Sequence, residues 1–217
     1  MKVVISGTSK GIGKEIASLF LERGHNVYGI DILPSTIGHN NYTHFVCDVR
    51  DKNKLPVIDN VEVLVNNAGI QEDTEEAIET NLIGLINTTN KYGKQEHIKA
   101  IVNIASAAGS TGSEFPYYAA SKGGVISYTK NTALEIAKYG ATCNSISPGG
   151  VITSSNDHIL SSPELYQKVL DETVLNKWTT RKEIAEFVYF VAVINKSMTG
   201  QDLLIDNGEA LKSNFIW

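Results

Sequence analysis

Cysteine, proline and excess positive charge are scarce in this chain, and long hydrophobic runs are missing. Its 217 residues include 2 cysteines and 5 prolines, and 24 acidic residues outnumber 19 basic ones, for a formal net charge of −5. Because no basic stripe is present, a nucleic-acid partner is not expected. The apolar runs fall short of the roughly 20 residues that a membrane-spanning helix needs, so no membrane partner is expected either.

The few cysteines and histidines argue against a metal site. Cys47 and Cys143 lie in strand-like apolar surroundings and match no metal-ligand spacing, so we expect buried, reduced thiols. The 5 histidines are scattered without a His-x-x-His pattern and give no case for zinc. We expect a cytoplasmic protein for two reasons. The thiols are predicted to be reduced, and no signal peptide is expected before the first apolar run, which begins at Val3.

The remaining composition, 42% hydrophobic and 20% charged, suits one globular domain with a sizeable core. Short β-branched runs predict seven strands, at residues 3–6, 26–30, 43–47, 61–65, 100–105, 142–147 and 203–205. Helical patterns fall between them, at residues 12–23, 72–91, 118–138, 163–172 and 181–193. The alternation predicts an α/β fold: a single doubly wound (Rossmann) domain over 1–217, with a seven-stranded, mostly parallel sheet and helices on both faces. Between the third and fourth strands we expect only a short helix, because Pro56 interrupts the pattern.

A glycine-rich turn joins the first strand to the first helix. The turn reads Gly7-Thr8-Ser9-Lys10-Gly11-Ile12-Gly13. Glycines at a strand–helix junction allow backbone N–H groups at the start of the helix to approach a pyrophosphate, so the turn predicts a dinucleotide site. Its spacing is G-x-x-x-G-x-G rather than G-x-G-x-x-G. An ordinary strand–helix turn would normally need one glycine.

Two charged residues bear on the choice of cofactor. Asp31 ends the second strand, twenty residues after Gly11, where a carboxylate can bind the adenosine ribose hydroxyls and repels a 2′-phosphate. Lys10 within the turn argues the other way, because a cation there could meet that phosphate. We favour NAD over NADP, since a carboxylate facing a phosphate is costly whereas Lys10 can turn into solvent.

Polar or small residues follow the next strands at the edge where open α/β sheets bind ligands. Asp48, followed by Val49, ends the third strand and could either cap the next segment or meet the adenine. Asn66-Asn67-Ala68-Gly69 follows the fourth strand, as a simple turn or as a surface against which a cofactor lies. Ser106 follows the fifth strand, as a loop hydroxyl or as a substrate contact.

The segment Tyr118-Ala119-Ala120-Ser121-Lys122 places a phenol and an ammonium four residues apart. On a helix they share one face, and a cation there favours the phenolate, which suits proton transfer to or from an oxygen. Taken alone, the pattern is also that of an ordinary surface pair. Tyr117 is an adjacent phenol, but only Tyr118 has a lysine four residues later.

Three motifs in order resemble the short-chain dehydrogenase/reductase family over essentially the whole chain. They are Ser6-Gly7-Thr8-Ser9-Lys10-Gly11-Ile12-Gly13, Asn66-Asn67-Ala68-Gly69 and Tyr118-Ala119-Ala120-Ser121-Lys122. Ser6 stands where the family usually has threonine, and the twelve-residue spacing from Ser106 to Tyr118 is one shorter than in many members. The loop 107–116 is therefore expected to shape the substrate pocket.

The resemblance implies a role for each site residue. The catalytic set would be Asn81, Ser106, Tyr118 and Lys122, with Asn81 disturbing its helix and holding a water beside Lys122. Ser106 would orient the substrate oxygen, Tyr118 would transfer the proton and Lys122 would hold the nicotinamide ribose, without a metal. The implied cofactor-binding residues are Gly7, Ser9, Lys10, Gly11, Ile12, Gly13, Asp31, Asp48, Val49, Asn67, Ala68, Gly69, Tyr118, Lys122, Pro148, Gly149, Val151 and Thr153.

The C-terminal third is expected to form the substrate side. Val151 backbone and the Thr153 hydroxyl would hold the nicotinamide carboxamide, by the same resemblance. Residues 154–162 are polar and turn-rich, and a helix is expected to open at Pro163. Residues 153–178 would form a mobile substrate lid. Thr180 and Glu183 form a capping box before the helix at 181–193. The apolar tip 215–217 is expected to pack on a neighbour or over the pocket.

The leading hypothesis is an NAD(H)-dependent oxidoreductase that interconverts a secondary alcohol and a ketone. An NADPH-dependent 3-oxoacyl-[acyl-carrier-protein] reductase is the alternative within this chemistry, and a non-catalytic dinucleotide-sensing protein is the alternative outside it. A related epimerase or dehydratase usually needs a larger substrate domain than this chain has room for. The resemblance also implies a homodimer or homotetramer, paired through the helices at 72–91 and 118–138.

Overall fold

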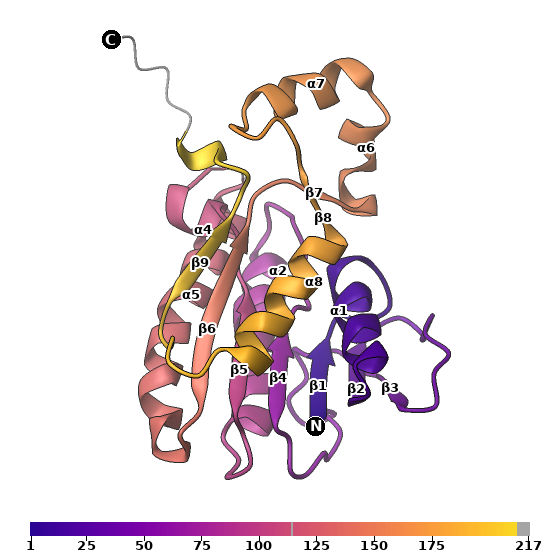
Figure 1. The fold of residues 1–217 in the computed structure, drawn as a ribbon, viewed down its shortest axis with the longest axis vertical. Coiled ribbons are helices and arrows are strands. Elements are labelled where there is room, and N and C mark those ends of the chain that lie inside the picture. Colours follow the sequence, from indigo (N-terminus) through magenta and orange to yellow (C-terminus); the bar gives the residue numbers. More distant parts are fainter. Residues whose placement is uncertain (114, 212–217) are drawn as a thin grey trace.

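The computed structural model describes residues 1–113 and 115–211 and is built on one seven-stranded parallel sheet (Figure 1). The strand order is β3-β2-β1-β4-β5-β6-β9. The strands are β1 (Lys2–Ser6), β2 (Asn26–Asp31), β3 (Tyr42–Val46), β4 (Val63–Asn66), β5 (Ala100–Ile104), β6 (Thr142–Pro148) and β9 (Asp202–Ile205). All six pairings are parallel, which confirms the predicted doubly wound α/β fold. The order reverses between β1 and β4, so a crevice is expected above that point.

The central strands are buried on both faces because helices cover both. Val3 and Ile5 of β1 belong to one apolar core, whereas Val4 belongs to the other, and all three are fully buried. Successive side chains of a strand point to opposite faces, so a continuous apolar run is what a doubly covered strand requires. The predicted strands were identified from such runs.

On one face α1 (Gly11–Glu22) packs against α8 (Arg181–Tyr189), which continues through η5 (Phe190–Ile194). The opposite face carries α5 (Pro116–Ile136) and one continuous helical segment over residues 75–93. That segment consists of α2 (Glu75–Ile78), the π-helical turn η1 (Glu79–Ile83), α3 (Gly84–Thr88) and the π-helical turn η2 (Thr89–Gly93). The helices predicted at 72–91 and 118–138 are thus confirmed, with the first starting three residues later.

The chain between β3 and β4 departs from the expectation of a short helix. Residues 47–62 contain only turns, bends and irregular backbone. Pro56 removes a helical N–H, and Asn60 adopts a positive φ of 58°, while Leu55 and Ile58 are still buried against the core. The apolar residues pack here without a helix.

Above the carboxyl edge of the sheet the chain forms a separate lobe (Figure 1). It comprises β7 (Val151–Ile152), η4 (Ser154–Asn156), α6 (Asp157–Leu160), α7 (Pro163–Asp171) and β8 (Thr179–Thr180). β7 and β8 pair in parallel as a second, two-stranded sheet that the sequence did not predict. The helix opening at Pro163 and the capping box of Thr180 and Glu183 are both confirmed.

The last described element is η6 (Glu209–Leu211), and the apolar tip 215–217 lies outside the described residues. Cys47 and Cys143 are free and buried, as predicted. Within residues 1–113 and 115–211, no helix combines the length and apolar character needed to cross a bilayer.

Candidate active site

The glycines of the glycine-rich turn are required either by their backbone conformation or by close packing. Gly7 and Gly11 adopt positive φ angles of 74° and 61°, which favour glycine. A Cβ on Gly13 would lie 2.0 Å from the carbonyl oxygen of Gly7 and 2.4 Å from Nδ2 of Asn67. The third glycine therefore lets α1 start directly against β1.

The residues after β4 brace this turn from the side. Asn67 Nδ2 donates to the carbonyl oxygens of Ser6 (3.1 Å) and Gly7 (3.0 Å). In return, the Ser6 hydroxyl accepts hydrogen bonds from the N–H groups of Asn67 (3.0 Å) and Ala68 (3.1 Å). Serine in place of threonine at position 6 keeps these bonds, because they need only the hydroxyl oxygen.

The turn fits the pyrophosphate of a dinucleotide. Within the described part of the chain, no carbonyl or side chain accepts a hydrogen bond from the N–H of Ile12 or Gly13, at the start of the 12-residue helix α1. These donors and the helix dipole favour an anion. A Cβ built on Gly11 would meet nothing within 4 Å, so the turn is open on that side.

Asp31 is held in place at the end of β2. Its Oδ2 accepts from the Ser9 N–H and its Oδ1 from the Leu33 N–H, both at 2.9 Å. The Ser9 hydroxyl also donates to the Leu33 carbonyl oxygen (3.1 Å). The glycine-rich turn and the end of β2 thus form one unit, whereas Lys10 is exposed.

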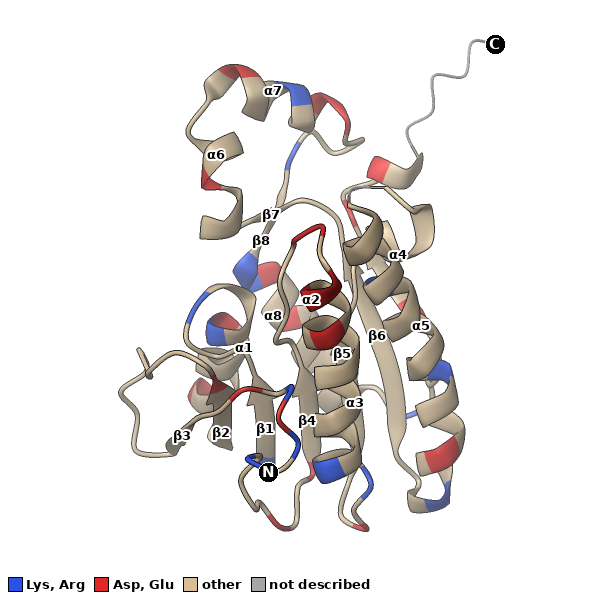
Figure 2. Cartoon of the chain, turned by 180° about the vertical axis from the view of Figure 1, so that it is seen from behind, with Lys and Arg blue, Asp and Glu red and all other residues tan. Residues whose placement is uncertain are grey.

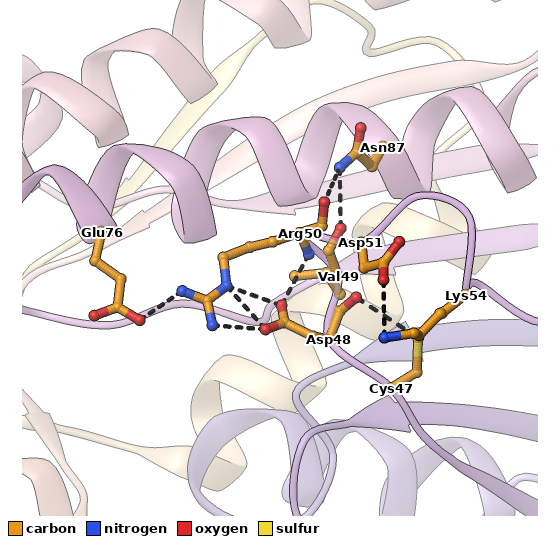
Figure 3. Close-up of polar contacts among 8 residues, drawn as sticks. All are labelled: Cys47, Asp48, Val49, Arg50, Asp51, Lys54, Glu76 and Asn87. Atoms are coloured by element: carbon orange, nitrogen blue, oxygen red, sulfur yellow. Dashed lines mark hydrogen bonds and ion pairs between the residues drawn. The ribbon is translucent and has the colours of Figure 1, made fainter.

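Asp48 caps the turn that follows β3. Its Oδ1 accepts from the Arg50 N–H (2.9 Å), and the Arg50 guanidinium binds both of its oxygens (Figure 3). These bonds hold the pKa of the Asp48 carboxyl below its ordinary value and raise the pKa of Arg50. The capping alternative is therefore confirmed, although the rest of this ion-pair cluster was not predicted.

Asn81 lies within the π-helical turn η1, where the helix departs from its regular hydrogen-bond ladder. Its side chain is 1% exposed, accepts from the Ile70 N–H (2.8 Å), and donates to the Ile70 carbonyl oxygen (2.9 Å) and the Ser121 hydroxyl (2.9 Å). The predicted disturbance of the helix at Asn81 is thus present. This amide joins the helical segment 75–93 to α5.

Lys122 brings Tyr118 and the carboxyl end of β5 together, two residues before Ser106. Lys122 is 6% exposed, and its ammonium nitrogen donates to the Ile104 carbonyl oxygen (2.8 Å) and lies 5.7 Å from the centre of the Tyr118 ring. Ser106 follows two residues after Ile104 and is also 6% exposed. The phenol and ammonium therefore share one helix face above the strand that delivers the serine.

Gly69 brings Asn81 into the same group. A Cβ on Gly69 would lie 2.9 Å from Asn81 Oδ1 and 3.6 Å from Lys122 Nζ. The structure thus gathers the amide, the ammonium and the end of the Asn66–Gly69 segment at one point. Only a residue without a side chain fits between them.

The short loop after Ser106 folds back onto α5. It forms α4 (Ala108–Thr111), and a Cβ on Gly109 would lie 2.7 Å from the carbonyl carbon of Lys122. The Ser106 hydroxyl accepts from the Ala108 N–H at 3.2 Å. Close packing at Gly109 therefore fixes Ser106 against the helix that carries Tyr118 and Lys122.

Residues 149–153, which follow β6, lie beside the segment that begins at Ser106. The Ala107 N–H donates to the Pro148 carbonyl oxygen, and the Gly149 N–H donates to that of Ile205, both at 2.9 Å. Val151 is buried and Thr153 is half-buried at the start of η4. A Cβ on Gly150 would lie 2.2 Å from the indole nitrogen of Trp178, so that tryptophan packs directly on the segment.

Sequence reasoning missed Arg50 and Trp178 because the pairing of Arg50 with Glu76 and the packing of Trp178 on Gly150 join residues far apart in the chain. The pair Gly149-Gly150 was a usable signal for Trp178, because adjacent glycines indicate that a large side chain approaches the backbone closely. Among the described residues, no three His, Cys, Asp or Glu side chains gather as a metal site.

Known proteins resemble this chain in sequence and in fold. The family model described as enoyl-(acyl carrier protein) reductase matches residues 7–209. A 3-oxoacyl-[acyl-carrier-protein] reductase of Staphylococcus aureus is 30% identical, in an alignment that covers 94% of this chain and 96% of the relative.

Two solved structures superpose closely. A 4-hydroxyisoleucine dehydrogenase mutant complexed with NADH and succinate is 26% identical with a TM-score of 0.89, covering 99% of this chain and 100% of its own. ElxO with NADP bound is 27% identical with a TM-score of 0.87, covering 97% and 99%. The chain therefore belongs to the short-chain dehydrogenase/reductase family of NAD(P)-dependent oxidoreductases.

Proposed function

We propose that this protein interconverts a secondary alcohol and a ketone with NAD(H), using Tyr118, Lys122, Ser106 and Asn81. The observation that supports this most is the position of Lys122. Its buried ammonium donates to the carbonyl oxygen of Ile104 and lies beside the Tyr118 ring. Ile104 ends β5, two residues before Ser106. A buried ammonium needs a reason, because burying a charge is costly.

Each residue has one task in the proposed reaction. Tyr118 transfers the proton to the carbonyl oxygen, or takes it from the alcohol, and Lys122 stabilises the phenolate that this leaves. Ser106 donates a hydrogen bond that orients the substrate oxygen toward Tyr118. The bound nicotinamide supplies or accepts the hydride.

Asn81 has a supporting task. Its amide makes three hydrogen bonds, two with Ile70 and one with Ser121, and these keep α5 in register with the π-helical turn. A water held at this turn beside Lys122 would carry protons between the site and solvent. Such a water also satisfies backbone groups that the π turn leaves out of the helical ladder.

The cofactor lies along the carboxyl edge of the sheet in this proposal. The turn Gly7–Gly13 holds the pyrophosphate, and the segments 48–49 and 67–69 line the adenosine side. Asp31 accepts hydrogen bonds from the ribose hydroxyls and disfavours NADPH, because its carboxylate is fixed by the Ser9 and Leu33 N–H groups and cannot turn away. Val151 and Thr153 hold the carboxamide, and residues 153–178 close over the substrate as a lid.

A second candidate is reduction of a 3-oxoacyl thioester with NADPH. The relative from Staphylococcus aureus is named a 3-oxoacyl-[acyl-carrier-protein] reductase, and Lys10 is exposed within the glycine-rich turn. Asp31 argues against it. Fold alone does not decide between these substrates.

Self-association is part of the proposal. Leu134 on α5 is 80% exposed and Ile83 on η1 is 44% exposed, so the two helical segments of this face carry uncovered apolar side chains. A homodimer or homotetramer would cover them. Light scattering of the purified protein measures its mass directly. A monomer at micromolar concentration would contradict the proposed self-association.

Comparing NADH with NADPH over a panel of ketones, 3-oxoacyl thioesters, sugars and steroids tests the function. We expect the protein to consume NADH with a simple ketone and to prefer NADH over NADPH by at least about tenfold. A tenfold preference corresponds to about 1.4 kcal/mol, which is assigned to Asp31. A strong NADPH preference with 3-oxoacyl thioesters would favour the second candidate. Binding of a dinucleotide without turnover of any compound would favour a sensor.

A further inference from the structure

A series of hydrogen bonds runs from the glycine-rich turn to the residues that hold Asp31. The Tyr42 hydroxyl lies 2.8 Å from the Thr8 hydroxyl and 2.8 Å from Nδ1 of His44. Nε2 of His44 lies 2.9 Å from the carbonyl oxygen of Leu33. The Leu33 N–H donates in turn to Oδ1 of Asp31 at 2.9 Å. These bonds make up the Tyr42–His44 network.

The network spans the two strands at one edge of the sheet. β3 forms that edge and pairs with β2, so that His44 is the partner of Gly29, two residues before Asp31 (Figure 2). A Cβ on Gly29 would lie 2.0 Å from the hydroxyl oxygen of Tyr42 and 2.5 Å from that of Thr8. The phenol therefore packs directly on the β2 backbone. Because Gly29 and Asp31 lie on the same face of β2, the network lies beside the carboxylate.

The donor of each hydrogen bond follows from the acceptor at its end. A carbonyl oxygen only accepts, so Nε2 of His44 carries the hydrogen in its bond to Leu33. In the neutral imidazole Nδ1 is then an acceptor, so the Tyr42 hydroxyl donates to it and the Thr8 hydroxyl donates to Tyr42. His44 uses both ring nitrogens, and this fixes the ring and with it the Leu33 carbonyl.

Leu33 connects the network to the carboxylate. Its carbonyl oxygen accepts from His44 and from the Ser9 hydroxyl (3.1 Å), while its N–H donates to Asp31. Its side chain is 43% exposed, so the residue is held more by its backbone than by packing. Releasing the carbonyl would therefore free the residue whose N–H fixes one oxygen of Asp31.

The loop that follows Asp31 supplies no charge that could take over its role. Residues 32–41 contain no Lys, Arg, Asp or Glu, and the loop is tan in Figure 2. A 2′-phosphate at the end of β2 finds no cation in this loop, and Lys10 in the glycine-rich turn is exposed. Discrimination between NADH and NADPH then depends on where the Asp31 carboxylate points.

We propose that Tyr42 and His44 are positioning residues for cofactor selection: they hold the Leu33 peptide so that the Asp31 carboxylate faces the ribose hydroxyls and excludes a 2′-phosphate. This rests on the proposed function, since it requires NAD(H) along the carboxyl edge of the sheet with a ribose at Asp31. Both side chains act through Leu33 and neither touches the cofactor. Loss of the network lets the carboxylate turn away, which weakens NADH binding and removes the repulsion of NADPH.

The test measures dissociation constants for NADH and NADPH by titration and takes their ratio for each variant. The wild type should bind NADH at least about tenfold more tightly. His44→Leu removes the donor to the Leu33 carbonyl and should lower this preference about three- to tenfold, the range expected for one hydrogen bond. His44→Gln retains an N–H for the same carbonyl and should stay within about twofold of the wild-type ratio. A purely structural defect would weaken both cofactors equally and leave the ratio unchanged.

Tyr42→Phe tests the other end of the network. It removes the hydroxyl that fixes the His44 ring, and it should lower the preference for NADH in the same direction as His44→Leu. Tyr28→Phe is its control. Tyr28 lies on the neighbouring strand β2, but it packs against the core on the opposite face of the sheet from Tyr42, so its loss of a hydroxyl should leave the ratio unchanged.

His39→Leu is the matched control for His44→Leu. His39 lies exposed in the loop 32–41, where its Nδ1 accepts from the Asn41 N–H (3.1 Å), and its replacement should keep the wild-type ratio. A melting temperature for each variant shows whether it is folded. Tyr42→Phe, which removes a single oxygen atom, carries the test if His44→Leu does not fold.

Three results would overturn the inference while the wild type still prefers NADH. They are an unchanged ratio in folded His44→Leu or Tyr42→Phe, an equal fall in either control, and an equal fall in His44→Gln, which would assign the effect to the ring rather than to its hydrogen bond. A wild type that binds neither dinucleotide, or that prefers NADPH, would count against the proposed function itself, and the inference would fall with it.

Discussion

At the scale of single residues, Gly69 is the point at which two buried polar groups of the site converge. Asn81 Oδ1 and Lys122 Nζ would both contact a side chain placed there. Neither neighbour can move freely, because Asn81 is bonded to Ile70 and Ser121 and Lys122 is bonded to Ile104. The segment Asn66–Gly69 after β4 is therefore constrained by two proposed catalytic residues as well as by the glycine-rich turn that it braces.

Gly69→Ala should reduce turnover strongly and lower the free energy of unfolding by about 1–3 kcal/mol, as overpacking does. Gly38→Ala is its control, since a Cβ there meets nothing within 4 Å and Gly38 has no positive φ. Steady-state kinetics and urea denaturation measure the two effects. Wild-type turnover in Gly69→Ala would show that Asn81 and Lys122 do not depend on this spacing.

At the scale of elements, the sequence predicts the strands and helices that carry a local or periodic pattern. Runs such as Val3-Val4-Ile5 identify buried strands, and all seven strands of the sheet were placed to within about two residues. The helix at 181–193 was found from its capping box, which is a local signal. The residues of the candidate site could also be predicted from local sequence, because each of their motifs stands at a strand end or on one helix face.

Contacts between distant segments were not predictable. The pairing of Arg50 with Glu76 and of Gly150 with Trp178 joins residues 26 and more positions apart, and neither has a periodic pattern. At residues 47–62, Pro56 already disfavours a helix, and the burial of Leu55 and Ile58 against the core then takes the place of the short helix expected there. Tertiary packing determined these features.

The capping box of α8 makes a pH prediction. The Lys177 ammonium, helped by the Thr180 N–H and hydroxyl, lowers the pKa of Glu183 from 4.5 to about 2. A carboxyl whose pKa falls on folding contributes stability above its unfolded pKa and loses it as the pH falls toward its folded pKa. Glu183 should therefore stabilise the protein above pH 4.5 and lose that effect between pH 4.5 and 2.

Glu183→Gln should cost about 1 kcal/mol at most at pH 7, because the pair is solvent-screened, and nothing near pH 2. Glu164→Gln is the control, since Glu164 is 81% exposed in its pair with Lys168. Chemical denaturation over this pH range measures both. A difference for Glu183→Gln that does not shrink on acidification would contradict the assigned ion pair.

At the scale of the whole molecule, the sheet and its two helical layers protect the thiols. Cys143 is fully buried in β6, and burial raises its pKa to about 12. In Cys47→Ser, which retains only Cys143, a thiol reagent near pH 8 should react only as fast as the protein unfolds. Reaction of Cys143 at the rate of a free thiol in the native protein would show that this core opens locally.

The central claim is that Tyr118 transfers the proton in an NAD(H)-dependent reaction. The most direct measurement compares Tyr118→Phe with Tyr117→Phe, a neighbour that is 41% exposed and lacks the lysine partner, in NADH turnover and in NADH binding. Tyr118→Phe should lose at least about 100-fold in kcat, as removal of a general acid or base does, while its Kd for NADH stays within a few-fold of the wild type. Tyr117→Phe should retain turnover. Wild-type kcat in Tyr118→Phe would contradict the account.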